Sequence, residues 1–192
     1  MIDIIGLQLK EWDSSQDKDV PRIVIMSGTG EKSFCAGGDV VGLYNSHIGK
    51  EGSDPNLKKN FLAQEYTVDY NLQIMKPFQI SFWNGYVMGG GVGVSQFSKI
   101  RIATEKSLWA MPETTIGFFP DVGASYFLSK VMQNPNLGIY MALTGHRVKG
   151  KDLLRYGLAT HFMSTNNFDK LKENLSSVTK ETKDEDIFKS VE

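Results

Sequence analysis

Two short apolar runs on either side of a long helical pattern restrict the fold of this chain more than any other feature. The runs are R-I-V-I-M at residues 22–26 and F-Q-I-S-F at residues 78–82, and both are typical of β-strands. Residues 57–75 between them place apolar side chains at helical steps of three or four. Two strands joined by a helix pair in parallel through a right-handed crossover, so this alternation predicts an α/β fold.

The alternation continues along the rest of the sequence. Apolar runs predict further strands at 101–104, 107–111 and 158–163, and periodic segments predict helices at 2–12, 39–46, 122–132, 137–143 and 150–156. The residues from 177 onward are rich in charge, and we expect this tail to be loosely held.

The composition is that of one globular domain and excludes several functions. Of the 192 residues, 41% are hydrophobic and 22% are charged. The net charge of −1 provides no electrostatic field that would attract DNA or an anionic membrane. The sequence contains no run of eighteen apolar residues, so no segment is expected to cross a membrane. Cys35 is the single cysteine, which excludes an internal disulfide and favours a reducing compartment. Residues 1–12 do not resemble a targeting segment, so the residues themselves do not indicate a localisation.

One acidic residue interrupts the apolar stripe of the helix predicted at 57–75. The stripe runs through Phe61, Val68 and Leu72, and Glu65 occupies the position where the next apolar residue is expected. A charge on a buried face is costly unless it has a partner or its pKa shifts. Glu65 is therefore either a site residue, or an acid that lies near the edge of the helix or pairs with a neighbour.

Two glycine-rich segments each follow a predicted strand and lead into a predicted helix. They are C-A-G-G-D at 35–39, after the strand at 22–26, and M-G-G-G-V-G at 88–93, after the strand at 78–82. Glycine lets the backbone approach a ligand closely, and two such loops could supply the two N–H donors of an oxyanion hole. Glycine clusters also form ordinary tight turns, and each loop alone is compatible with that role.

The segment M-P-E-T-T-I-G-F-F-P-D at 111–121 carries two acids in an apolar setting. Asp121 could cap the helix that follows it, and Glu113 could lie in a helical first turn. Capping does not account for Glu65 and the two glycine loops as well. We therefore interpret 111–121 as the wall of a pocket, turned at Gly117 so that both acids face one ligand.

Several other kinds of site are excluded by spacing. Residues 28–30 lack the third glycine of a dinucleotide-binding motif, and neither a nucleotide P-loop nor a serine nucleophile elbow occurs. His47, His146 and His161 are isolated from other metal ligands, so no metal site is expected. No histidine lies near Cys35, which is predicted to be a small core residue rather than a nucleophile.

Four segments in fixed order resemble the crotonase superfamily, also called the enoyl-CoA hydratase/isomerase superfamily. They are F-C-A-G-G-D (34–39), N-G-Y-V-M-G-G-G-V-G (84–93), A-T-E-K-S-L-W-A-M-P-E-T-T-I-G-F-F-P-D-V-G (103–123) and A-L-T-G-H-R-V-K-G (142–150). The resemblance extends over roughly residues 1–165 and is greatest to the 3-hydroxyisobutyryl-CoA hydrolases of valine breakdown. It implies a ββα-spiral core over residues 1–176, incomplete at both ends, followed by the charged tail at 177–192.

The resemblance also assigns roles to five residues. It implies that the backbone N–H groups of Gly38 and Gly90 form an oxyanion hole, and that Glu113 and Asp121 are catalytic. It implies that Glu65, Gly90, Glu113 and Asp121 bind the substrate. It further implies that CoA enters as part of the substrate, with no separate cofactor and no metal.

Departures from the superfamily pattern favour one activity within it. Hydratases of the superfamily carry a second glutamate where this chain has Gly93, and they carry glycine where this chain has Asp121. The resemblance therefore implies a hydrolase of CoA thioesters, with an acyl-CoA as its small-molecule partner, no DNA or membrane partner, and a mitochondrial location. A homo-oligomer, or protein partners in a large complex, are further partners that we consider. The alternative function is that of a structural, non-catalytic component of a large assembly such as the mitochondrial ribosomal small subunit.

Overall fold

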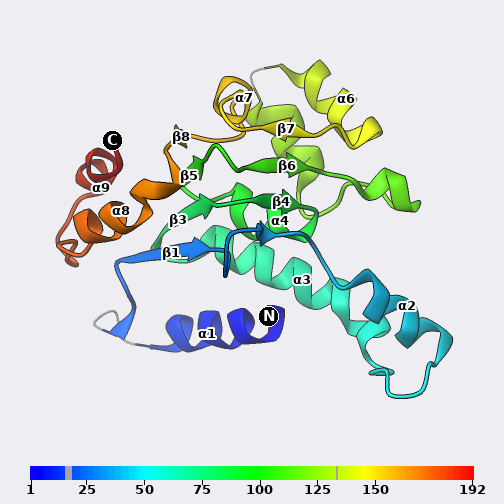
Figure 1. Cartoon of the computed structure of the whole chain (residues 1–192). Coiled ribbons are helices and arrows are strands. Elements are labelled where there is room, and N and C mark those ends of the chain that lie inside the picture. The colour runs from blue at the N-terminus through cyan, green and yellow to red at the C-terminus, as the bar shows by residue number, and fades with distance from the viewer. Residues whose placement is uncertain (16–18, 133) are drawn as a thin grey trace.

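The computed structural model describes residues 1–15, 19–132 and 134–192. Its strands form two four-stranded sheets (Figure 1). The first sheet is parallel throughout and contains, in spatial order, β1 (Ile23–Ser27), β3 (Phe78–Trp83), β5 (Ile100–Ala103) and β8 (His161–Phe162). The second contains β2 (Ser33–Cys35), β4 (Tyr86–Met88), β6 (Leu108–Ala110) and β7 (Val148–Lys149), of which only β7 is antiparallel to its neighbour.

The chain winds as a spiral through these two sheets. Each of the first three windings contributes one strand to the first sheet and then one strand to the second, as β1 and β2, β3 and β4, and β5 and β6. Strands of successive windings are neighbours in space and run parallel, as in the pairing of Ile25 with Ile80 in the first sheet. This topology confirms the predicted α/β fold with a ββα-spiral core.

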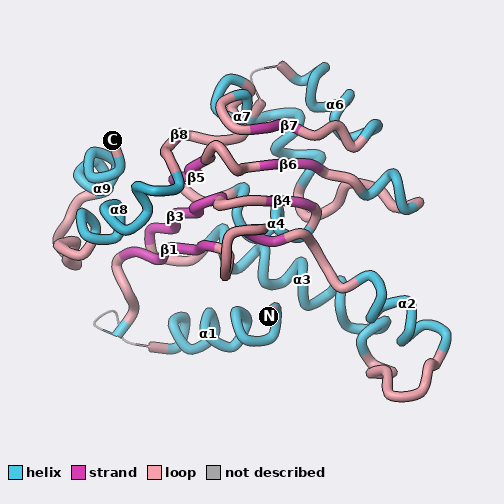
Figure 2. The backbone as a smooth tube through the Cα atoms, viewed as in Figure 1, coloured by secondary structure: helices cyan, strands magenta, loops and turns pink. Residues whose placement is uncertain are grey.

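The first half of the chain contributes the helices α1 (Ile2–Ser14), α2 (Val40–Ile48), α3 (Leu57–Ile74) and α4 (Gly90–Gln96). In Figure 2, α1 and α3 lie along one side of the sheets, and α2 lies beyond the strands, beside α3. The long helix α3 contacts α1, α2 and α4 and connects the first winding to the second. Leu9 of α1, Val68 and Leu72 of α3 and Val94 of α4 form an apolar cluster, because each helix turns its apolar stripe toward the others.

The second half of the chain adds short helices around the ends of the sheets. They are η2 (Glu113–Ile116), α5 (Ala124–Tyr126), the π-helical turn η3 (Phe127–Val131), α6 (Pro135–Thr144), α7 (Asp152–Arg155), η4 (Thr165–Asn167), α8 (Phe168–Leu175) and α9 (Asp184–Val191). Every residue of β3 is buried, so this strand is the centre of the core. Trp83 at its end packs in a large cluster with Trp109 and Phe127.

The predicted elements are largely confirmed, and the differences have local causes. The strands β2, β4 and β7 were not predicted, because two or three residues are too few to show a period. The glycine loops therefore follow β2 and β4 directly, and not the strands at 22–26 and 78–82. The helix predicted at 122–132 begins at Ala124 and changes to a π-helical turn, and the strand predicted at 158–163 shortens to two residues.

The prediction of a loosely held tail is wrong for its last residues. Residues 184–191 form α9, and Ile187 and Val191 pack with α8 against the first sheet. Asp184 accepts hydrogen bonds from Arg22 and from Lys99, which tie the start of α9 to the strand edge. The charges of this segment lie on the solvent side of an amphipathic helix, which is why composition alone suggested a loose tail. The proposed division at residue 176 stays a prediction.

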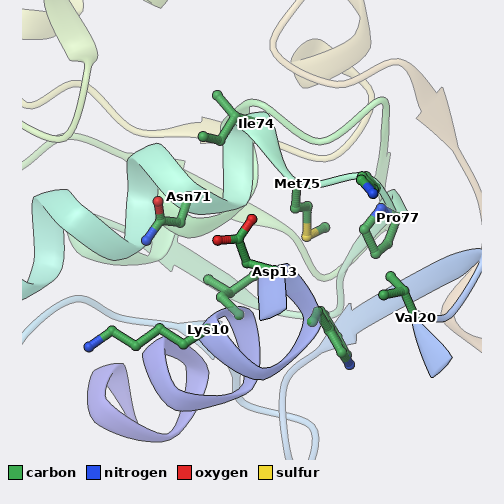
Figure 3. Close-up of a pocket in the computed structure, with 10 residues that line it drawn as sticks. Lys10, Asp13, Val20, Asn71, Ile74, Met75 and Pro77 are labelled. Atoms are coloured by element: carbon green, nitrogen blue, oxygen red, sulfur yellow. The ribbon is translucent and has the colours of Figure 1, made fainter. Parts of the chain in front are cut away.

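Two further features of the fold concern its helices and a cavity away from the predicted site residues. In the described ranges, no helix is long and apolar enough to span a bilayer. A cavity of about 250 Å³ lies between the ends of α1 and α3, where Figure 3 shows Lys10 and Asp13 opposite Asn71 and Met75. None of the predicted site residues lines this cavity.

Candidate active site

Three parallel strands of the second sheet end at the same edge, and a predicted site residue follows each of them. Gly38 follows β2, Gly90 follows β4, and Glu113 follows β6. The strands are neighbours in register, with Cys35 opposite Val87 and Met88 opposite Ala110. Residues that are 23 to 75 positions apart in the sequence are therefore brought together at the carboxyl ends of parallel strands, where α/β proteins commonly bind ligands.

The two glycine loops lie against each other. Gly37 has a φ of +100°, which favours glycine, and a Cβ built on it would lie 3.7 Å from the backbone nitrogen of Gly90. Gly89 has a φ of +53° and precedes the first residue of α4. The backbone of one loop thus approaches the other with no side chain between them, as the prediction of two converging loops requires.

Glu65 lies on the inner face of α3, directly against the second loop. Its side chain is buried, and its Oε1 lies 2.2 Å from the position that a Cβ on Gly90 would occupy. Burial, followed by the nearby charges of Asp121 and Glu113, raises the pKa of Glu65 to about 7. The two alternatives for Glu65 are wrong, because its side chain is only 6% exposed and, among the described residues, it forms no ion pair.

Glu113 is the first residue of the short helix η2, which Gly117 ends with a φ of +78°. Its Oε1 lies 2.9 Å from the position of a Cβ on Gly89, and its Oε2 is buried without a hydrogen-bond partner in the described part of the chain. Burial raises the pKa of Glu113 to about 7, and the charge of Asp121 acts in the same direction. A carboxyl group with this pKa is suited to act as a base near neutral pH.

Asp121 lies on the loop between η2 and α5. The Tyr66 hydroxyl donates a hydrogen bond to Asp121 Oδ2 at 2.8 Å. The helix α5 begins three residues later, after Gly123, and no described side chain caps it, so the alternative role of Asp121 as a helix cap is wrong. Glu113 does lie in the first turn of the helix η2, as its alternative interpretation stated, although no described side chain caps that helix. A place in a helical first turn is therefore compatible with a place at the site.

One cavity of about 550 Å³ brings the five predicted residues together. Gly38, Glu65, Gly90, Glu113 and Asp121 all line it, and its remaining walls are mainly apolar. These walls include Leu43, Phe61, Leu62, Ile116 and Phe118. The segment at 111–121 forms one side of the cavity and turns at Gly117, which confirms that this stretch is a pocket wall. The catalytic and binding roles of the five residues stay predictions.

A second acid on α3 was not among the predicted site residues. Asp69 lies one helical turn after Glu65 and is 8% exposed, and in the part of the chain that the structure describes neither of its oxygens has a hydrogen-bond partner. Burial, followed by the charges of Glu65 and Asp121, raises the pKa of Asp69 to about 8. The spacing of four residues from Glu65 on the same helix was the available signal.

A second cavity of about 610 Å³ adjoins the first at Asp121. Asp121 lines both cavities, whereas Tyr66 and Asp69 line only the second, whose walls are largely aromatic. These aromatic residues are Tyr70, Phe97, Phe119 and Tyr126. Asp121 therefore marks the junction between an acid-rich cavity and an aromatic one.

Among the described residues, no group of three or more His, Cys, Asp and Glu side chains could hold a metal ion. Cys35 is only partly buried, so the prediction that it fills the core is correct in part. Burial is the main cause of the raised pKa of its thiol, which disfavours the nucleophilic thiolate.

A ββα spiral whose glycine loops and acids meet at the strand ends defines a protein of the crotonase superfamily. The sequence model described as enoyl-CoA hydratase/isomerase matches residues 1–192. The chain belongs to this family.

Curated relatives and solved structures agree with this assignment. The mitochondrial 3-hydroxyisobutyryl-CoA hydrolase of Danio rerio is 44% identical over 175 residues, which are 91% of this chain and 44% of that protein. The proteins of the same name from Gallus gallus and Homo sapiens are each 40% identical, over 96% of this chain and 46% and 45% of their own lengths. The chain thus spans about half the length of these relatives.

Among solved structures, an enoyl-CoA hydratase from Rhodobacter sphaeroides 2.4.1 superposes with a TM-score of 0.80 at 28% identity, covering 95% of this chain and 53% of that one. A carnitinyl-CoA dehydratase from Mycobacterium thermoresistibile superposes with a TM-score of 0.77 at 34% identity, covering 91% of this chain and 48% of that one. The relatives named here are enzymes, so the alternative of a structural component of a large assembly gains no support.

Proposed function

We propose that the chain carries the reaction centre of a hydrolase that converts 3-hydroxyisobutyryl-CoA to 3-hydroxyisobutyrate and CoA. The observation that carries this proposal is the meeting of Gly38, Gly90, Glu65, Glu113 and Asp121 in one cavity. The names of the curated relatives support the choice of substrate. Position 93, where a Cβ would meet Asp69 and Val122, is glycine, so among the described residues that line the first cavity Glu113 is the only glutamate outside α3.

The glycine loops would bind the thioester carbonyl. Its oxygen lies between the N–H groups of Gly38 and Gly90, and these donors stabilise the negative charge that develops on the oxygen during attack. In other enzymes the loss of one such donor lowers the rate about 100-fold to 1,000-fold. The approach of Gly37 to the nitrogen of Gly90 supports this arrangement, because it leaves both backbones open toward one space.

Glu113 would supply the nucleophile or the base. In the first route its carboxylate attacks the carbonyl carbon and forms an anhydride, which water then cleaves to release the acid and restore the carboxylate. In the second route the carboxylate removes a proton from the attacking water. In both routes the carbon–sulfur bond breaks, the sulfur leaves as the thiolate of CoA and takes up a proton, and water supplies the new oxygen of the acid product. The raised pKa of Glu113 supports this role, because the carboxyl can both accept and release a proton near neutral pH.

Asp121 and Glu65 would bind the acyl group. Asp121 accepts a hydrogen bond from the 3-hydroxyl, and Glu65 completes the polar end of the cavity. Leu43, Phe61 and Leu62 provide apolar walls for the remainder of the acyl group. CoA enters as part of the substrate, so the reaction needs no separate cofactor. By resemblance to the relatives, the protein acts in mitochondria.

A thioester-cleavage assay tests this proposal. The release of free thiol from 3-hydroxyisobutyryl-CoA is measured for the wild type, for Glu113→Gln and for the control Glu173→Gln, which alters an exposed residue of α8. We expect Glu113→Gln to lower kcat by about 100-fold or more, since it removes the group that moves the proton, and we expect the control to match the wild type. Equal rates for Glu113→Gln and the wild type would refute the role of Glu113.

A further inference from the structure

Tyr66 is the one side chain that hydrogen-bonds Asp121 in the ranges that the structure describes. It follows Glu65 on α3, so a single helix provides both an acid of the first cavity and a donor to another acid of that cavity. The contact joins residues 55 positions apart, and its oxygen–oxygen distance of 2.8 Å is typical of a good hydroxyl–carboxylate hydrogen bond. Tyr66 approaches from the second cavity and does not line the first.

The backbone beside Asp121 is also held in place. Val122 has a φ of +44°, which is rare for a β-branched residue and persists only where the surrounding structure fixes it. Its side chain is buried at 5% exposure, and a Cβ on Gly93 would lie only 2.6 Å from its Cβ. The packing thus fixes the main chain at Asp121, and the Tyr66 hydroxyl fixes the rotation of the carboxyl group.

This arrangement leaves one oxygen of Asp121 for a ligand. Tyr66 occupies Oδ2, and no described side chain donates to Oδ1. A carboxyl oxygen at the wall of the first cavity can accept a hydrogen bond from a hydroxyl of the acyl group. Asp121 is partly exposed, and an acyl group bound in the first cavity would cover it. A site built to bond a substrate hydroxyl rejects the analogue that lacks it, because the polar group that the ligand covers is then left unpaired.

We propose that Tyr66 is a positioning residue that makes the site selective for acyl thioesters bearing a hydroxyl, by holding Asp121 Oδ2 so that Oδ1 faces the acyl group. The inference rests on the proposed hydrolase function and extends it, since it names the residue that sets the preference for thioesters with the hydroxyl over thioesters without it. Tyr66 does not touch the reacting atoms. Its effect is on the orientation of Asp121 and therefore on the choice between substrates.

The chain offers a matched control for this residue. Tyr70 lies one turn later on α3, also lines the second cavity, and makes no hydrogen bond through its hydroxyl to any described residue. The variants Tyr66→Phe and Tyr70→Phe each remove one hydroxyl and keep the ring. For each variant and the wild type, kcat/KM is measured with 3-hydroxyisobutyryl-CoA and with isobutyryl-CoA, which differ only in the hydroxyl.

We expect the ratio of the two kcat/KM values to fall about tenfold in Tyr66→Phe, which corresponds to one hydrogen bond to a charged group. The ratio in Tyr70→Phe should equal that of the wild type. If Tyr66→Phe lowers both kcat/KM values by the same factor, or leaves the ratio unchanged, Tyr66 has a structural role only and the proposal is wrong.

A binding measurement separates this proposal from the function on which it rests. Calorimetric titration of the same two thioesters into the Glu113→Gln variant, with and without Tyr66→Phe, gives the ratio of their dissociation constants without turnover. A preference for the hydroxylated thioester that disappears with Tyr66→Phe supports the inference even where hydrolysis is not detected. Equal binding of the two thioesters in the presence of Tyr66 overturns it, whatever the hydrolysis assay shows.

Discussion

Replacement of Asp69 by asparagine should stabilise the protein relative to the wild type, by an amount that grows as the pH rises. The buried carboxyl of Asp69 has no hydrogen-bond partner in the described part of the chain, so ionisation in the folded state is costly. Burial and the charges of Glu65 and Asp121 raise its pKa from 3.8 to about 8. Asparagine has nearly the same shape and does not ionise, so Asp69→Asn removes only the cost of that charge.

The size of the effect follows from the two pKa values. Between pH 5 and pH 8 an aspartate in the unfolded chain has already lost its proton, whereas folded Asp69 still holds one. The folded state therefore binds more protons, and the free energy of unfolding of the wild type falls by about 1.4 kcal/mol for each pH unit in this window. Over three units, the free energy of unfolding of Asp69→Asn should rise by about 4 kcal/mol relative to that of the wild type.

Urea unfolding at pH 5, 6, 7 and 8 measures this difference. The matched control is Asp152→Asn, which removes an exposed carboxyl from α7, and its difference from the wild type should not grow with pH because water surrounds that group in both states. Glu65 and Glu113 titrate in the same window, but they are present in all three proteins and so do not contribute to the comparison at first order. A difference between Asp69→Asn and the wild type that is the same at pH 5 and pH 8 would show that Asp69 is not held neutral in the fold.

Three shorter predictions follow from other parts of the structure. The rate of thioester hydrolysis should rise as the pH passes through about 7, because the pKa of Glu113 is raised to that value and its carboxylate form is the active one; a rate that stays level from pH 6 to pH 8 would contradict this. Gly91→Ala should cost several kcal/mol of stability in urea unfolding, since its Cβ would lie 2.2 Å from the backbone oxygen of Cys35 and cannot be accommodated by a side-chain movement. Asp184→Ala should speed amide hydrogen exchange in α9 and cost about 1 kcal/mol or less, because the lost ion pairs with Arg22 and Lys99 are partly exposed; unchanged exchange would show that apolar packing alone holds the helix.

The site was predictable from the sequence because its residues depart from the hydrophobic patterns around them. Glu65 stands on an apolar stripe, and the acids at 113 and 121 lie among large apolar residues, so each was conspicuous without a structure. The convergence of the glycine loops was predicted, but its cause was not. That cause is the pairing of β2 with β4, two strands of three residues each, which are too short for any periodic signal.

Other features depend on tertiary structure that no local pattern reveals. Asp69 resembles an ordinary solvated acid until α3 is placed against α4 and the loop at 121–123. Tyr66 bonds a residue 55 positions away, and Val122 adopts its unusual φ only because Gly93 leaves room for its side chain. The packing of α9 depends on Ile187 and Val191, two apolar residues in a segment otherwise dominated by charge.

The site is distributed over successive windings of the spiral, and this affects when activity appears during folding. Gly38, Gly90 and Glu113 belong to three different windings, and Glu65 arrives on the helix that links the first two. Contacts between residues so distant in sequence form slowly, since long loops must close before the contacts are made. A partly folded chain does not bring these residues together and should not cleave thioesters. During refolding, the recovery of thioester cleavage would therefore report the packing of the third winding onto the second. It would lag behind the recovery of helical circular dichroism.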